Sequence, residues 1–286
     1  MGPVSGPWRV AVAAGLSAAA LILVAGCASG AGSAHGAPGA ESSGSPLPPR
    51  QALLTAATEA NRINSAVETI IVQDRGASTS TMTGTFRYQL KPTMEASADF
   101  HTDMFGMTTQ MKAIATSDAV YFNLGRLPDF VGMGQVARKP WIKVDLSGLN
   151  GWELAGFAQL VEGTQSGDFT AQAHLFAVAE NVYVAGTQVI DGVPTTEYDG
   201  SFRVAAALKA LPASFHKVLA AELQALGTGP VYFREWIDSQ YHVRKTIEVH
   251  TVNGTTTTST VLITAFNQPV DITLPPASQT VTEFIL

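Results

Sequence analysis

Short segments in which polar and apolar residues alternate follow one another through most of this 286-residue chain, with hairpin-length connections between them. A period of two is typical of β-strands that are covered on one face. The pairs Asp191-Gly192 and Asn253-Gly254 supply the tight turns that join antiparallel strands. We therefore expect one large antiparallel sheet, which has to curl or be covered to hide its apolar face. The predicted strands are Ala66–Val72, Thr81–Leu90, Met94–Thr102, Met107–Thr116, Ala119–Leu124, Trp141–Leu146, Phe169–Ala177, Asn181–Ile190, Thr195–Phe202, Val231–Ile237, Arg244–Val252 and Thr255–Phe266.

A few segments have instead the three- and four-residue apolar spacing of helices. Pro48-Pro49 precedes the first of them, Pro212 separates the last two, and Gly227 follows the last. Helices beside a mainly antiparallel sheet indicate the α+β class. The predicted helices are Gln51–Ile63, Gly151–Val161, Val204–Leu211 and Ala213–Leu226.

Cys27 is the only cysteine and ends a short apolar run. Val24-Ala25-Gly26-Cys27 resembles a bacterial lipobox, and Arg9 with the apolar Val10–Val24 has the composition of a signal peptide. That run is shorter than the roughly 20 residues of a membrane-spanning helix. We expect residues 1–26 to be a lipoprotein signal peptide and Cys27 to carry acyl chains such as palmitate on the extracytoplasmic face of the cell membrane. An uncleaved anchor and plain secretion are the alternatives.

The segment after the cysteine is rich in glycine, serine, alanine and proline. Such a composition cannot bury enough apolar surface to fold, so we expect residues 27–50 to be a lipidated cysteine with a disordered tether. No second linker of this kind interrupts residues 51–286, which we expect to form a single domain. With its only thiol acylated, that domain would depend on apolar burial rather than on disulfides for its stability.

The chemistry-bearing residues are few. A formal net charge of −6 disfavours nucleic acid as a partner. None of the nucleophile, zinc-protease, phosphate-loop or dinucleotide motifs occurs, so we expect no enzyme activity and no cofactor. His101 and Asp103 share a strand face but have no third metal ligand beside them in the sequence. Glu248 and His250 have the same spacing, and we interpret them as a solvent-facing polar row.

Several segments resemble the actinobacterial LppX/LprG lipoproteins. Val189–Phe202 resembles a conserved hairpin of that family, and Trp236–Asp238 with Val243–Lys245 is similar to its late tryptophan strand. Asn267–Pro276 is similar to its closing strand. The chain departs from the pattern at Tyr241-His242, where the family has a glycine turn.

The resemblance implies a LolA-like fold: a curved, half-open antiparallel barrel with helices packed on its concave face. It also implies an apolar cavity between sheet and helices that accepts the acyl chains of a lipid or glycolipid. Methionines and the apolar stripes of the helices are the candidates for its lining. These residues are Met104, Met107, Met111, Phe157, Leu160, Leu208, Leu211, Phe215, Leu219 and Leu223.

Both groups of candidates have an alternative interpretation. Thioethers are soft ligands that suit Cu(I), so Met104, Met107 and Met111 could instead handle copper. Flexible methionines are also typical of an adaptable apolar surface. The helix stripe from Leu208 to Leu226 could be ordinary core.

The sequence therefore predicts a membrane-anchored lipoprotein that binds a lipid or glycolipid and carries it toward the cell envelope, with an envelope transporter as a candidate partner. The alternatives are a cavity-free surface lipoprotein that acts as an envelope scaffold or accessory module, and a copper-handling lipoprotein.

Overall fold

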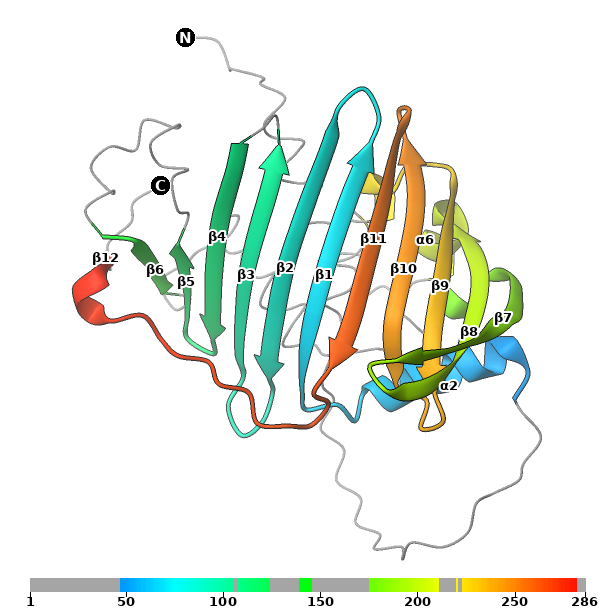
Figure 1. Cartoon of the computed structure of the whole chain (residues 1–286), viewed down its shortest axis with the longest axis horizontal. Coiled ribbons are helices and arrows are strands. Elements are labelled where there is room, and N and C mark those ends of the chain that lie inside the picture. The colour runs from blue at the N-terminus through cyan, green and yellow to red at the C-terminus, as the bar shows by residue number, and fades with distance from the viewer. Residues whose placement is uncertain are drawn as a thin grey trace, which may run out of the picture.

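All twelve strands in the described part of the chain belong to one sheet. The computed structural model describes residues 47–104, 107–123, 139–145, 175–210, 220 and 223–281. The strand order is β12-β6-β5-β4-β3-β2-β1-β11-β10-β9-β8-β7, so the sheet does not close on itself. Neighbouring strands are antiparallel, except that β12 is parallel to β6. Figure 1 shows this sheet face-on, with helices behind its β8–β10 end.

The bounds of the elements follow the hairpin turns. The helices are α2 (Pro49–Ala60), α6 (Val204–Ala210) and the short η3 (Ala277–Gln279). The strands are β1 (Ser65–Arg75), β2 (Thr79–Gln89), β3 (Glu95–Met104), β4 (Met107–Thr116), β5 (Ala119–Asn123), β6 (Trp141–Asp145), β7 (Glu180–Ile190), β8 (Val193–Arg203), β9 (Pro230–Asp238), β10 (Val243–Val252), β11 (Thr255–Thr264) and β12 (Thr280–Val281).

Helix α2 begins at a proline because a first-turn residue needs no donor for the helix ladder. Pro49 fills that position, and the N–H of Ala52 donates to the Pro48 carbonyl at 3.0 Å. The Arg50 guanidinium donates to the carbonyls of Ala177 and Ala179, which ties the start of α2 to the segment that leads into β7. One side of α2 is then buried against the sheet.

The predicted α+β class with a large curved antiparallel sheet is confirmed. Eleven of the twelve predicted strands have an observed counterpart within about three residues at either end. The prediction for Phe169–Ala177 is wrong where the structure describes it, since Leu175–Ala177 are helical. Periodicity cannot separate a strand from a helix in so short an apolar run. The predicted helix Gly151–Val161 lies outside the described residues.

The end of the chain also differs from the closing strand implied by the resemblance. Residues 267–276 make no sheet ladder. They run across the ends of the strands from β11 toward β6 (Figure 1), and the chain rejoins the sheet only at the two-residue β12. None of the helices among the described residues is long and apolar enough to cross a membrane.

Two apolar clusters lie at the two ends of the sheet. One combines α2 and α6 with strands β8 and β9, through side chains such as Leu53, Ala207 and Phe233. The other covers β1 to β5, through side chains such as Ile70, Phe86 and Val120. The face of the sheet that carries both clusters is called the inner face below.

Candidate functional site

The candidate site lies on the inner face, where the pairing register fixes which residues are neighbours. Side chains on one face of a sheet recur at every second residue and meet their cross-strand partners. One continuous row on the inner face therefore crosses eight strands. It consists of Met111, Phe100, Gly84, Ile70, Val261, Thr246, Glu235 and Tyr198.

In strand β10 the polar side chains, and not the apolar ones, lie on the inner face. Its apolar residues Ile247 and Val249 pair with Arg234 and Tyr232 of β9, which belong to the outer face. Its polar residues Thr246, Glu248 and His250 consequently lie on the inner face. The interpretation of Glu248 and His250 as a solvent-facing row is therefore wrong, because their side of the strand is the covered one. Alternation shows which residues share a face, but not which face is covered.

Four polar residues meet where β9, β10 and β11 cross the inner face, and we call them the acidic patch. Thr246 is paired with Glu235, and Glu248 is paired with Ser259. Burial raises the pKa of Glu235 to about 8, with a smaller contribution from Glu248. Burial also raises the pKa of Glu248 to about 7. Both carboxyls therefore hold a proton for much of the time near neutral pH.

Ser259 completes the acidic patch. It is 4% exposed, and its Oγ makes no hydrogen bond with the described residues. A buried hydroxyl without a partner is unfavourable, because it gives up its hydrogen bonds to water without replacement.

Glu68 of β1 lies on the same face, between Phe86 and Ile263 of the neighbouring strands. It is fully buried, and within the described part of the chain neither carboxyl oxygen has a hydrogen-bond partner. Burial raises its pKa to about 8. The inner face thus contains a second polar group with unused hydrogen-bonding capacity.

A polar row closes this region toward the β10–β11 hairpin. Asp74 accepts hydrogen bonds from Ser80 Oγ and Thr257 Oγ1, both at 2.7 Å. His250 is the cross-strand neighbour of Thr257. Burial lowers the pKa of His250, and the nearby Asp74 carboxylate partly opposes that shift.

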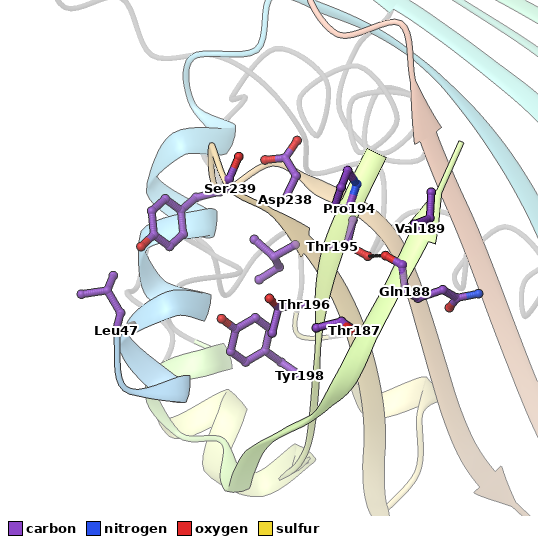
Figure 2. Close-up of a pocket in the computed structure, with 12 residues that line it drawn as sticks. Leu47, Thr187, Gln188, Val189, Pro194, Thr195, Thr196, Tyr198, Asp238 and Ser239 are labelled. Atoms are coloured by element: carbon purple, nitrogen blue, oxygen red, sulfur yellow. Dashed lines mark hydrogen bonds between the residues drawn. The ribbon is translucent and has the colours of Figure 1, made fainter. Parts of the chain in front are cut away.

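A groove of about 570 Å³ lies at the other end of the inner face, beside the start of α2. Its volume falls within the range of about 300–1,000 Å³ that is usual for small-molecule sites. Figure 2 shows Leu47 on one side and Tyr198, Thr196 and Val189 on the other. Tyr198 is also the cross-strand neighbour of Glu235, so the groove adjoins the acidic patch. The lining residues are Leu47, Thr187, Gln188, Val189, Pro194, Thr195, Thr196, Tyr198, Ile237, Asp238, Ser239 and Tyr241.

Asp238 organises the turn beside this groove. Its Oδ1 accepts from the backbone N–H groups of Gln240 and His242 at 2.8 and 3.0 Å, and its Oδ2 accepts from Arg244 Nε at 2.8 Å. These bonds hold Tyr241 at a φ of 63°. The turn thus achieves without glycine the left-handed conformation that a glycine usually supplies.

Only part of the predicted cavity lining falls within the described residues. Met104 is paired with Met107 in the backbone register, and Met111 lies on the inner face, opposite Phe100. Leu208 packs against the core cluster of α2 and β9, and Leu223 is fully buried within it. Cys27, Phe157, Leu160, Leu211, Phe215 and Leu219 lie outside the described residues.

The other histidine pair lies away from this face. His101 and Asp103 are exposed, and His101 Nε2 is 3.6 Å from the Asp99 carboxylate, which also contacts Lys112 at 3.0 Å. No group of three or more histidine, cysteine or acidic side chains suited to a metal ion occurs within the described ranges.

Glu68, Glu235 and Ser259 are functional candidates that were not predicted from the sequence. The sequence does carry a signal for both glutamates. Each is an even number of residues from the apolar side chains of its strand, and so shares their face. Ile70 and Val72 follow Glu68 at that spacing, while Phe233 and Ile237 flank Glu235. No comparable signal exists for Ser259, which follows a run of threonines on both faces.

Comparison with solved structures identifies the fold. The chain aligns with the lipoprotein LprF from Mycobacterium bovis at a TM-score of 0.51 and 14% identity, over 81% of this chain and 99% of that one. The Mycobacterium tuberculosis lipoprotein LppX aligns at a TM-score of 0.40 and 15% identity, over 78% of this chain and 99% of that one. A LolA superfamily protein from Nitrosomonas europaea aligns at a TM-score of 0.27 and 10% identity, over 80% of this chain and 96% of that one.

The alignment with LprF confirms the predicted likeness to the LppX/LprG lipoproteins as a likeness of fold. No protein-family model matches the sequence. No curated protein matches it either.

Proposed function

We propose that the chain is a lipoprotein, anchored in the cell membrane through Cys27, that binds the acyl chains of a lipid or glycolipid between its sheet and helices. It would shield these chains from water while the lipid moves toward the cell envelope. Three observations support it. The fold is similar to that of LprF, the sequence has a lipobox-like segment, and the inner face has both apolar groups and buried polar groups without a partner among the described residues.

The groove beside α2 is the observation on which this proposal depends most. It lies beside the start of α2, and its lining comes from Leu47 just ahead of that helix, from β7, β8 and β9, and from the turn after β9. Apolar side chains of Leu47, Val189 and Ile237 contribute to its lining, and Tyr198 links it to the remainder of the inner face. Each methylene group that moves from water into such a site contributes roughly 0.8 kcal/mol to binding.

Native mass spectrometry of the full chain, purified from a host that contains diacyl lipids, tests the proposal. We expect one lipid per chain to remain bound after detergent removal. Thr196→Lys puts a charge in the groove on the inner face and should reduce the bound fraction, because a charged side chain disfavours an acyl chain beside it.

Ile71→Lys is the matched control, because Ile71 is 37% exposed on the opposite face of β1. This variant should retain lipid like the unmodified chain. Recovery of the unmodified chain without lipid from several hosts would contradict lipid binding and favour the cavity-free scaffold instead.

A further inference from the structure

We propose that the acidic patch of Glu235, Thr246, Glu248 and Ser259 binds the head of the lipid, and that this head is uncharged and carries hydroxyl groups. The inference rests on the proposed lipid-binding function and specifies which polar group the ligand presents. It concerns the chemistry of the site rather than the length or number of the acyl chains.

Strand β10 turns its polar side toward the inner face. A strand that only completed a hydrophobic core would turn Ile247 and Val249 inward, and β10 turns them outward. The residues that it places on the inner face, Thr246 and Glu248, are hydrogen-bonding residues. Polar groups on a covered face need hydrogen-bond partners, which a bound ligand can supply.

Polar groups on this face have unused hydrogen-bonding capacity. The Ser259 hydroxyl lies directly opposite Glu248 in the register, is almost wholly buried, and has no partner among the described residues. Glu68 shares this face, with both carboxyl oxygens equally without a described partner. A ligand hydroxyl can donate to and accept from such groups at once.

Charge gives the ligand class. The pKa values of Glu235 and Glu248, raised to about 8 and about 7, allow their carboxyls to act as neutral donors and acceptors. A phosphate beside them would place more negative charge where carboxylates are already disfavoured. The nearby cations Arg234 and Lys245 cannot offset it, because they stack on Trp236 on the opposite face of the sheet, at 5.7 and 4.2 Å from its ring centre.

The groove and the acidic patch adjoin each other on the inner face. Tyr198 lines the groove and neighbours Glu235, so a ligand with its chains in the groove would have the acidic patch within reach. The groove is open to the outside, whereas Ser259 and Glu235 are buried. The head would therefore be the deeply bound part of the ligand.

Three probes with the same acyl chains test this: dioleoylglycerol, its O-methyl ether and dioleoylphosphatidic acid. The full chain is loaded with each from detergent micelles at neutral pH, and retained lipid is measured by native mass spectrometry. We expect dioleoylglycerol to be retained at least about tenfold better than the phosphatidic acid, and the ether, which cannot donate, to fall between them.

Variants separate head recognition from folding. Ser259→Ala and Glu248→Leu should bring the retention of dioleoylglycerol down to that of its ether, whereas Glu248→Gln, which still donates and accepts, should preserve the difference. Glu197→Gln on the outer face is the matched control and should change nothing. Circular dichroism of each variant establishes that it is folded.

Equal retention of all three lipids by the unmodified chain would overturn the inference and leave acyl-chain binding intact. Retention of none of them would contradict the proposed function itself. A preference for the phosphatidic acid would also overturn the inference, because it would require a cationic head site.

Discussion

The ring of Phe100 in β3 occupies the space that a side chain at Gly84 in β2 would need. A Cβ atom at Gly84 would lie 2.2 Å from Phe100 Cδ1 and 3.1 Å from the Asp99 carbonyl oxygen. Phe100 is buried in the cluster that covers β1 to β5, so its ring has little freedom to move away. The glycine is therefore what permits the aromatic ring to lie flat across the inner face.

Gly84→Ala should destabilise the protein by about 1–3 kcal/mol, because overpacking forces the ring out of its position. Urea denaturation with a fluorescence readout measures the change. Gly186→Ala in β7 is the matched control, since nothing lies within 4 Å of a Cβ there. An unchanged midpoint for Gly84→Ala would mean that the ring does not pack as the structure has it.

Asp238 gives a second prediction. Asp238→Ala removes the acceptor for two backbone N–H groups and for the Arg244 guanidinium, which is only 19% exposed. Leaving a largely buried cation and two donors unpaired should cost about 3 kcal/mol. Asp238→Asn keeps the acceptor of the turn and should cost less. Thermal unfolding followed by circular dichroism ranks the two variants.

Asp191→Asn serves as the control for Asp238. Asp191 is exposed at the β7–β8 turn with a φ of 48°, a conformation that asparagine also tolerates. Its melting temperature should match that of the unmodified chain. A similar melting temperature for Asp238→Ala would show that the turn does not depend on these bonds.

The buried glutamates predict a stability that falls as pH rises. A carboxyl whose pKa is about 8 in the folded chain and 4.5 in the unfolded chain holds more protons when folded between those values, as Glu68 does. Below pH 4.5 the carboxyl is protonated in both states, so its titration does not change the free energy of unfolding. Between pH 4.5 and about pH 8 the free energy of unfolding falls by about 1.4 kcal/mol per pH unit. Glu235 adds an effect of the same sign over a similar range.

Glu68→Gln should therefore flatten this pH dependence and raise stability most at pH 8. Urea unfolding at several pH values between 5 and 8 measures the difference between the two chains. His250 titrates in both, so its opposite contribution cancels from that difference. Glu180→Gln, at a carboxyl that is 50% exposed, should keep the original slope. Parallel curves for Glu68→Gln and the unmodified chain would be incompatible with a buried Glu68.

Turn chemistry explains why the sheet could be predicted so closely. Asp191-Gly192 and Asn253-Gly254 both adopt positive φ, as the tightest hairpins require, so the strands that they join begin and end within two residues of the predicted bounds. Sequence alone could not give the order of strands distant in the chain, such as the pairing of β1 with β11. That pairing depends on packing across the whole sheet.

The site was less predictable for a physical reason that β10 illustrates. An alternating strand predicts that its apolar side is covered, and Ile247 and Val249 break that rule. The rule fails where the covered face has hydrogen-bonding groups. A face that binds a ligand needs such groups. The spacing of Glu248 therefore predicts a solvent-facing side chain, although its side of the strand is covered.

Cys27→Ser should release the protein from the membrane. The variant lacks the thiol that would carry the acyl chains, and a single acyl chain already gives only marginal membrane binding. Membrane fractionation and labelling with a palmitate analogue in a bacterial host measure the change. Ser29→Ala, two residues along the expected tether, should leave both readouts unaltered. Membrane retention and labelling of Cys27→Ser would refute lipid attachment at this cysteine.

The methionines of β3 and β4 distinguish a lipid-facing surface from a copper site. Met107 and Met111 are four residues apart in one strand, and a rise of about 3.3 Å per residue separates their Cα atoms by about 13 Å. A Cu(I) ion needs its thioether ligands in direct contact, so Met111 is poorly placed to complete a set with the Met104–Met107 pair.

Leucine replaces methionine in an apolar surface at a cost below about 1.5 kcal/mol. We therefore expect the double variant Met107→Leu, Met111→Leu to retain bound lipid. Its Cu(I) uptake, measured by competition with a chromogenic chelator, should equal that of the unmodified chain. Stoichiometric uptake that the double variant loses would instead establish a copper function.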